Sequence, residues 1–490
     1  MKSLEKGGFY MKEKRIFAFA LCIVLSLSLS SCTVADYVNN LDALETHATT
    51  KKPPVYTLGT SAYDTNITTS GTTLFIDGTD FGLTEVIIPK KPKATAVAMK
   101  TADSEKLKIS DDLISKDVDV SAGIAKNRGK LTLEGMTAVS SSKSSDTAES
   151  RFFGTSSAFL CMPSSQIDIK NSVITTTGNG VSACFAYGTG SVIDISQSEI
   201  MTQNANARAL ASTYHGNIYA AGSKISTNGM NSPAVFVGVN GGTITVTGGE
   251  ISTLGVSSPA VYSEGTVSMT GVKINTTSSE AAVIEGKNSV SLTGCDIESG
   301  STTFTLYQSN SGETNKGLAT LNLVGGTIEA KSGALFYVAN TDAKICLQAV
   351  EINSNSSSLV NVVANEKWGE VGENGGKATI VANFQKLEGD IYADNLSEVK
   401  LELSALSTFE GTINSRNTAK KADIILDGTS KWILTGNSFV SSITPGMADF
   451  SNIIDNGYTI YYDADNPTNV YLNGETITLQ DGGILTPMKK

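Results

Sequence analysis

The chain has 490 residues and a net charge of −11, and only 17% of its residues are charged, against roughly 25% in globular proteins. An acidic chain without basic clusters lacks the positive surface that nucleic-acid binding requires, so no nucleic-acid partner is expected. Two histidines argue against a metal centre built from several imidazoles. With 40% hydrophobic residues and 10 prolines, the composition is that of a folded protein and not of a disordered or collagen-like one.

Residues 1–31 have the features of a secretory signal. Basic residues precede an apolar run over 16–29, as in such signals, and the run is shorter than the roughly 20 residues that span a bilayer. It ends in Leu29-Ser30-Ser31-Cys32, which resembles the lipobox of bacterial lipoproteins. The resemblance implies that Cys32 is lipidated and anchors the protein to a membrane of the bacterial cell envelope. In enteric lipoproteins, an Asp directly after the lipidated Cys retains the protein at the inner membrane. Thr33 stands at that position here, so the resemblance implies the outer membrane.

A short apolar phrase recurs along the rest of the chain. Two apolar residues separated by one position are followed, five residues after the second, by an isoleucine, as in Ile193-Asp194-Ile195 with Ile200. The recurring residues are Ile174, Ile200, Ile225, Ile251, Ile274, Ile297, Ile328 and Ile352. Alternation with period two indicates strands, and a repeat of this length made of short strands indicates a solenoid. The sequence therefore predicts an all-β fold.

The residues that flank each recurring isoleucine predict how the coils stack. Hydroxyl side chains stand two positions later, on the same inward face: Thr176, Thr202, Thr227, Thr253, Thr276 and Ser299. Glycines, which suit a corner with positive φ, stand three positions earlier: Gly222, Gly248, Gly271, Gly294 and Gly325. Directly before the isoleucine, the sign of the charge alternates from coil to coil: Glu199, Lys224, Glu250, Lys273 and Asp296. Stacked opposite charges favour one register, so we interpret them as structural.

Each period also holds a second apolar run, as in 234–236 and 260–262. Two strands and an irregular third side per coil resemble the right-handed parallel β-helix of pectate-lyase-like proteins and autotransporter passengers. The resemblance implies about fourteen coils of 22–26 residues, stacked ~4.8 Å apart. A solenoid end must not expose its core, so a cap is expected before the first clear coil. The predicted segments are a signal peptide over 1–31, a lipidated Cys32 with a tether over 32–55, an N-terminal cap over 56–128 and the β-helix over 129–490.

Asp168 and Asp194 occupy the same outward position of neighbouring coils. Two carboxylates stacked about 5 Å apart repel one another. They are relieved if both are solvated and splay apart near Lys170, or if they bind calcium, which prefers oxygen ligands. Retaining glycosidases also place two carboxylates about 5–5.5 Å apart, although inside a cleft. Calcium is thus the one cofactor that the sequence raises, and it stays an alternative.

Two departures from the period predict loops at one corner of the solenoid. Extra residues follow Tyr307, and a second insertion over 365–376 carries Trp368. The coil between them has a short turn with Asn340 and Asp342. Two loops beside a low coil would leave a notch about 10 Å wide, twice the coil spacing, whose aromatic walls and polar floor suit a glycan. The alternative is a pair of plain surface loops in which Trp368 packs against its own coil.

The four cysteines of the body, Cys161, Cys184, Cys295 and Cys346, form no C-x-x-C pair, so a metal knuckle is unsupported. Cys161 and Cys184 lie in adjacent coils and could approach one another, but small buried thiols are the commoner arrangement. The motifs of the β-helix polygalacturonases are scrambled here, and no G-x-S-x-G nucleophile elbow is present. No catalytic residue is therefore assigned.

The function that the sequence predicts is that of a lipid-anchored envelope protein that binds a polysaccharide or a host surface without catalysis. The alternatives are a polysaccharide lyase or glycosidase on the same fold and a purely structural spacer, and fold alone does not decide between them.

Overall fold

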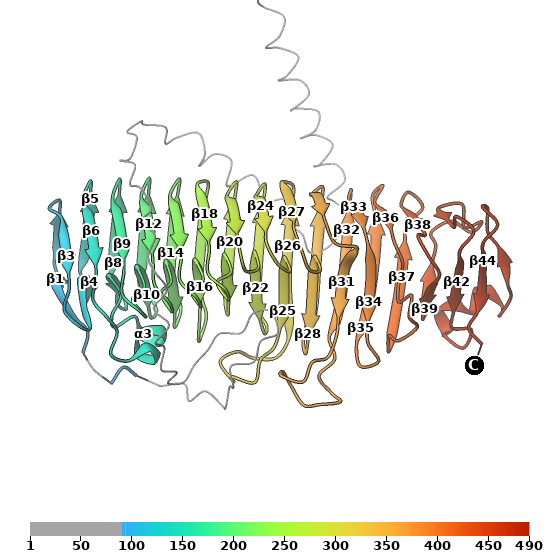
Figure 1. Ribbon diagram of the computed structural model, residues 1–490, viewed down its shortest axis with the longest axis horizontal. Helices are drawn as coiled ribbons and strands as arrows, with labels where there is room; N and C mark the ends of the chain where they lie inside the picture. Colours follow the sequence, from blue (N-terminus) through green and yellow to red (C-terminus); the bar gives the residue numbers. More distant parts are fainter. Residues whose placement is uncertain (1–90, 94, 490) are drawn as a thin grey trace, which may run out of the picture. The chain divides into compact units, whose positions relative to one another are not determined.

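The computed structural model describes residues 91–489 except residue 94. In this part of the chain, successive strands pass from one parallel sheet to a second, to a third and back to the first, here called sheets A, B and C (Figure 1). The result is a parallel β-solenoid of about 16 turns, which confirms the predicted fold class. The signal peptide, Cys32 and the tether lie outside the described residues.

The strands of each sheet follow one another in chain order. Sheet A contains β1 (Val97–Asp103), β4 (Val120–Lys126), β7 (Phe159–Cys161), β10 (Cys184–Tyr187), β13 (Leu210–Thr213), β16 (Val235–Val237), β19 (Val261–Ser263), β22 (Ala282–Glu285), β25 (Phe304–Tyr307), β28 (Phe336–Ala339), β31 (Ser358–Val362) and β34 (Asp390–Ala393). Sheet B contains β2 (Lys106–Ile109), β5 (Lys130–Glu134), β8 (Gln166–Lys170), β11 (Val192–Ser196), β14 (Gly216–Ala221), β17 (Gly242–Thr247), β20 (Thr266–Thr270), β23 (Ser289–Thr293), β26 (Leu318–Val324), β29 (Asp342–Gln348), β32 (Lys377–Asn383), β35 (Glu398–Ser404), β37 (Lys421–Leu426) and β40 (Ser442–Thr444). Sheet C contains β3 (Leu113–Ser115), β6 (Thr137–Ser140), β9 (Val173–Thr176), β12 (Glu199–Thr202), β15 (Lys224–Thr227), β18 (Glu250–Thr253), β21 (Lys273–Thr276), β24 (Asp296–Ser299), β27 (Thr327–Ala330) and β30 (Glu351–Ser354).

Two smaller sheets complete the C-terminal coils. The first contains β33 (Lys386–Glu388), β36 (Thr408–Glu410), β38 (Lys431–Ile433) and β41 (Ile453–Ile454). The second contains β39 (Ser438–Val440), β42 (Thr459–Tyr462), β44 (Ile484–Pro487) and β43 (Ile477–Thr478), and its last pair is antiparallel. Helical structure in the described residues is the α-helix α3 (Thr147–Phe153) and the 3₁₀ helix η2 (Pro467–Leu472).

Two predictions about the coils were wrong. The solenoid begins before residue 129, because β1 to β4 already pair in register with the coils that follow. This start was missed because Leu113 takes the place of the isoleucine and Ser115 that of the threonine, as their pairing along sheet C shows. The third side of the coil is also not irregular, since the phrase bends at its corner into separate strands of sheets B and C.

The predicted register is confirmed in sheet C. The recurring isoleucines pair with one another from coil to coil, and so do the charges that precede them. Three of the buried threonines, Thr176, Thr202 and Thr227, donate hydrogen bonds to carbonyls five residues further on, as Thr202 Oγ1 does to the Ala207 oxygen at 2.9 Å. The five corner glycines have φ between 55° and 62°, which is the left-handed region that glycine favours.

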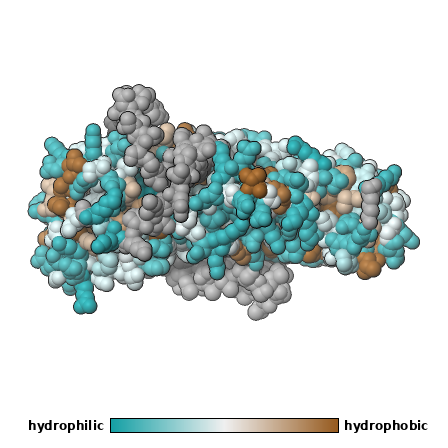
Figure 2. Space-filling view, turned by 90° about the horizontal axis from the view of Figure 1, so that it is seen from below, coloured by the Kyte–Doolittle hydropathy of each residue, from teal (hydrophilic) through white to brown (hydrophobic). Residues whose placement is uncertain are grey.

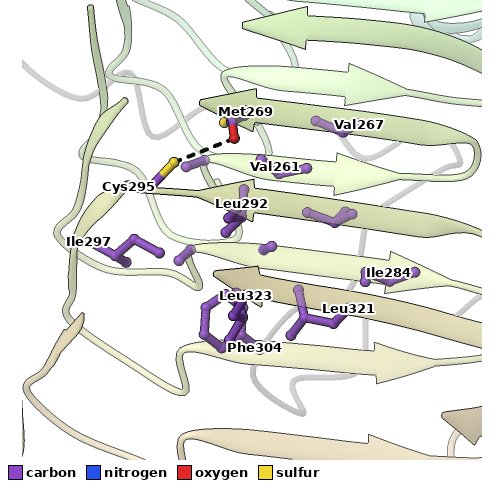
Figure 3. Packing of buried hydrophobic residues seen from close by; sticks show 14 of the residues in the cluster. Val261, Val267, Met269, Ile284, Leu292, Cys295, Ile297, Phe304, Leu321 and Leu323 are labelled. Atoms are coloured by element: carbon purple, nitrogen blue, oxygen red, sulfur yellow. Dashed lines mark hydrogen bonds between the residues drawn. The ribbon is translucent and has the colours of Figure 1, made fainter. Parts of the chain in front are cut away.

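The space between the sheets is filled by apolar side chains from every coil, some of which are shown in Figure 3. The cysteines at 161, 184, 295 and 346 are free and buried. Cys161 pairs with Ala186 and Cys184 with Phe159, so the two thiols do not stack on each other. Burial raises the pKa of the Cys161 thiol to about 12. These cysteines are thus core residues, as the commoner reading predicted.

The face of the described residues in Figure 2 is mostly hydrophilic, with isolated hydrophobic residues. Within residues 91–489, no helix has the length and apolar character needed to cross a membrane.

Sheet A differs from an ordinary solenoid sheet because side chains on both of its faces are buried. Its outward side chains, such as Phe185, Phe236, Tyr262 and Tyr307, form a second apolar cluster, and Trp368 from the loop after β31 packs into it. Helix α3 packs against part of this face, and its Phe153 ring stacks on Tyr214 with centroids 5.6 Å apart. Figure 1 shows α3 and the loops after β25 and β31 on the same edge of the solenoid.

Helix α3 is short, and its two ends are fixed by local chemistry. The Asp146 side chain accepts hydrogen bonds from the backbone amides of residues 148 and 149 and so caps the N-terminus. Gly154 ends the helix in the left-handed conformation. A Cβ at Gly154 would come within 2.4 Å of the Phe185 ring, so glycine also permits the close approach of the helix to sheet A.

Candidate functional site

A polar groove of about 700 Å³ lies at the corner where sheet A turns into sheet B. It is called the A–B groove below. Its lining comes from five consecutive coils: His215, Asn217, Asn240, Gly241, Gly242, Thr243, Glu264, Gly265, Thr266, Lys287, Asn288, Ser289, Glu313, Thr314, Asn315, Leu318 and Thr320. The lining is rich in amides and hydroxyls, which both donate and accept hydrogen bonds.

One row of five side chains runs along the wall of the groove. They lie near the start of the sheet B strands β14, β17, β20, β23 and β26, and each pairs with the next across the coils: Asn217, Thr243, Thr266, Ser289 and Thr320. In each coil the following residue is buried in the core, as Val267 is after Thr266, so the alternation of the strand turns these side chains outward. The row therefore presents one hydrogen-bonding group per coil, about every 4.8 Å.

Small residues keep the corner of the groove narrow. Gly241 has φ +67°, and a Cβ at Gly265 would come within 2.5 Å of Val237 Cγ1 and 2.7 Å of the Gly242 oxygen. Any side chain at residue 265 would therefore displace the neighbouring coil. The lining also includes two exposed basic residues, His215 and Lys287.

Beside the groove, a cluster of charged side chains is buried between sheet A, α3 and residues 308–317, which are here called the wall segment. Two of its members, Glu264 and Glu313, line the groove. Arg151 of α3 has its Nη2 2.6 Å from Glu313 Oε2 and 3.7 Å from Glu264 Oε1. Both carboxylate side chains are about 1% exposed. A second guanidinium, that of Arg208, is buried with them, and burial, with the positive charge of Arg151, lowers its pKa to about 9.

Glu285 holds the wall segment onto sheet A. Its carboxylate accepts hydrogen bonds from the hydroxyls of Tyr262 and Tyr307. It also accepts from the backbone amide and the hydroxyl of Ser309, the second residue of the segment. Burial raises the pKa of Glu285, and these donors act against that rise because they stabilise the ionised form.

Glu264 is the member of the cluster with the fewest partners. It lies one residue beyond Ser263, which pairs with Ile284, so Glu264 and Glu285 are neighbours on the outer face of sheet A. Neither carboxylate oxygen of Glu264 has a hydrogen-bond partner. Burial, followed by the charges of Glu313 and Glu285, raises the pKa of Glu264 well above its usual range. Burial and the neighbouring acids therefore both favour the neutral form of the Glu264 carboxyl.

A neutral and an ionised carboxyl placed close together can act as an acid and a base. Glu264 and Glu313 each approach the same Arg151 nitrogen, so their nearest oxygens are no more than about 6 Å apart. Glycoside hydrolysis uses such pairs at about 5–5.5 Å or 6.5–9.5 Å. However, although both residues line the groove, their side chains are only about 1% exposed, so a sugar could reach the carboxylates only if α3 or the wall segment moved. Among residues 91–489, no three His, Cys, Asp or Glu side chains are arranged to hold a metal ion.

The predicted notch between the two loops is wrong, although both loops leave the predicted corner. The wall segment and the loop after β31 bond to each other, because Asn310 accepts a hydrogen bond from the Gly369 amide at 2.7 Å. Tyr307 and Trp368 are buried with ring centroids 4.2 Å apart, so they pack on each other and leave no room for a ligand.

The two polar residues that were expected to form the floor of that notch lie in different environments. The side chain of Asn340 is buried and donates to the Gln308 oxygen at 2.7 Å. Asp342 is exposed at the start of β29. The groove lies on the other side of the wall segment, over β14 to β26.

Asp168 and Asp194 are register partners, as predicted. Neighbouring side chains relieve their repulsion: Lys130 Nζ lies 2.6 Å from Asp168 Oδ2. The Gln166 amide donates to both carboxylates, at 2.7 and 3.1 Å. Burial also raises the pKa of Asp194, because a desolvated carboxylate is less favourable than the neutral acid. Lys130 and the Gln166 amide therefore stabilise the two stacked carboxylates at the position where the sequence raised calcium.

The groove and the buried cluster were not predicted, although a signal for each is present in the sequence. A polar residue precedes the first apolar position of the phrase in each coil of the groove, such as Thr266 before Val267. Glu264 and Glu285 each close the second apolar run of neighbouring coils. The partner Arg151 could not be found this way, because it lies far away in the chain and outside the repeat.

Comparison with family models, curated proteins and solved structures found no match to this chain.

Proposed function

We propose that this protein is a lipid-anchored protein of the bacterial cell envelope that binds a glycan along the A–B groove without cleaving it. The proposal is carried by the row of side chains from Asn217 to Thr320. A row with one hydrogen-bonding group about every 4.8 Å can contact successive units of an extended polymer whose repeat is similar.

The chemistry of the lining favours a saccharide over a peptide. Hydroxyl and amide side chains can both donate to and accept from sugar hydroxyls. The one large apolar residue in the lining is Leu318, so the groove has no pocket for an apolar side chain. The glycan can belong to the envelope itself or to a host surface, in which case the protein acts in adhesion.

The anchor rests on the signal-like residues 1–31 and on Cys32. One acyl chain gives only weak membrane binding, whereas two or more anchor a protein stably. A Cys32 that carries two or more acyl chains would therefore tether the solenoid stably to a membrane.

The experiment is retention on a panel of immobilised polysaccharides, followed by analysis of the products. We expect one or more polysaccharides to retain the protein with no new reducing ends or unsaturated sugars. Thr266→Arg would place a long cationic side chain in the middle of the row and should abolish retention. Thr270→Arg is the matched control, because Thr270 lies on the same outward face of β20 but outside the groove. Retention that is the same in both variants would place the binding site elsewhere.

A second candidate function, glycoside hydrolysis, is favoured by one observation, the proximity of Glu264 and Glu313 beside the groove. New reducing ends that disappear in Glu313→Gln would establish it. If the protein is retained by no polysaccharide and cleaves none, the remaining function is that of a structural spacer. The burial of both carboxylates makes binding without cleavage the better supported function.

A further inference from the structure

The wall segment is part of the A–B groove and part of the buried cluster at the same time. Thr314 and Asn315 line the groove, whereas Glu313, the residue before them, is paired with Arg151 of α3. Any change that releases Glu313 from α3 would therefore move one wall of the groove.

The charges inside the cluster do not balance when every acid is ionised. Three acids face two guanidinium groups: Glu264, Glu285 and Glu313 against Arg151 and Arg208. The other titratable groups packed around them include Tyr262 of β19, Tyr307 of β25, Glu149 of α3 and Tyr214, the residue after β13. Burying an unpaired charge costs several kcal/mol, so one acid must stay neutral for the cover to remain closed.

Glu264 is the acid whose neutral form the geometry requires. Glu285 is stabilised as an anion by Tyr262, Tyr307 and Ser309, and Glu313 by Arg151 at 2.6 Å. Glu264 has the distal end of Arg151 at 3.7 Å, and no donor is hydrogen-bonded to either of its oxygens. Its other close neighbour is the carboxyl of Glu313, which favours a proton on Glu264. An ionised Glu264 would also compete with Glu313 for the one guanidinium that holds the wall segment.

We propose that the wall segment is a proton-dependent wall of the A–B groove, closed while the Glu264 carboxyl keeps its proton and released when it loses it. The closed form is at full stability below the ordinary titration range of glutamate. It loses stability as the pH rises from there, by about tenfold in the opening equilibrium per pH unit, until Glu264 is ionised in the closed form as well. The inference deepens the proposed glycan binding, because it states how binding in the groove is regulated.

The test is amide hydrogen exchange of the full-length protein between acidic and alkaline pH, corrected for the intrinsic rates. The reporters are the amides of Ser309, Ser311 and Glu313, which are hydrogen-bonded within or beneath the segment. We expect their protection to fall by about tenfold per pH unit, while that of β17 stays constant. Glu264→Gln should abolish this pH dependence. Glu250→Gln, at an outward position of sheet C, is the matched control and should keep it.

The outcomes separate this inference from the proposed function, because hydrogen exchange needs no glycan. A pH-independent wall segment in the wild type, or the same slope in E264Q, overturns the proton-dependent wall and leaves glycan binding standing. Failure of every glycan to bind, with the slope and its loss in E264Q observed, overturns glycan binding alone. If E264Q does not fold, Glu264→Met, which is also neutral and of similar size, takes its place.

Discussion

Arg151 Nη2 lies 2.6 Å from Glu313 Oε2, although 162 residues separate the two in the chain. This ion pair joins helix α3 to the wall segment across the outer face of sheet A. The strands of the described solenoid contact mainly the strands of adjacent coils, so this pair ties together coils that the repeat keeps apart.

Arg151→Met should destabilise the protein by about 3–5 kcal/mol, because it leaves Glu313 buried without its partner. The free energy of unfolding in urea measures this cost. Lys331→Met is the control, because it breaks an exposed ion pair with Glu298. The Lys331 side chain is 55% exposed and that of Glu298 is 40% exposed, so this variant should cost less than about 1 kcal/mol. Equal costs for the two variants would mean that the Arg151 pair is not a special contact.

The inward hydroxyl ladder makes a second prediction, with its control inside the ladder. Thr227 Oγ1 donates to the Ser232 oxygen at 2.6 Å, so Thr227→Val should cost about 1–3 kcal/mol by leaving that carbonyl unsatisfied. The Thr253 hydroxyl is buried and has no partner, so Thr253→Val should be neutral or stabilising. Urea unfolding of both variants tests this order, and the reverse order would contradict it.

The stability cost of replacing a corner glycine should depend on how well the new residue adopts a positive φ and not on the size of its side chain. Gly271 has φ +62°, and a Cβ there would meet no atom within 4 Å. Gly271→Val should lower the thermal midpoint, since a left-handed conformation costs an ordinary residue roughly 1–2 kcal/mol. Gly271→Asn should lower it less, because Asn171 already occupies the equivalent corner with φ 47°. If both variants have the same midpoint, the backbone conformation does not limit this corner.

Cys32→Ser should release the protein from membranes, because lipidation at this residue is the proposed anchor. Fractionation of cells, together with metabolic labelling by a radioactive fatty acid, measures both consequences. Cys22→Ser changes the other cysteine of the signal region and should leave labelling and membrane association unchanged. A Cys32→Ser protein that stays in the membrane fraction would contradict the lipid anchor.

The fold was predictable because each coil repeats the same local chemistry. The series from Ile174 to Ile352 fixes the inward face and the register, and the corner glycines fix the turns. The start of the solenoid was not predictable, because Leu113 and Ser115 fill the same positions with different residues. A sequence pattern identifies a coil only where the coil has the same residue types as the other coils at the repeated positions.

The site was predictable only in part. The corner from which the two loops leave was predicted correctly, because insertions in a solenoid are accommodated at the turns between strands. The fate of the insertions was not, because Tyr307 and Trp368 are as able to pack on each other as to hold a sugar. The ion pair between Arg151 and Glu313 has no local signature at all, since a contact across so many coils depends on tertiary structure.

The alternating charges of sheet C also constrain how the chain can change in length. Glu199, Lys224, Glu250, Lys273 and Asp296 follow one another in adjacent coils with opposite signs. Loss of a single coil from this series would place two like charges side by side, which is unfavourable. Loss or duplication of two coils would keep the alternation intact. In this region, we therefore expect gain or loss of coils in pairs to be tolerated better than gain or loss of one coil.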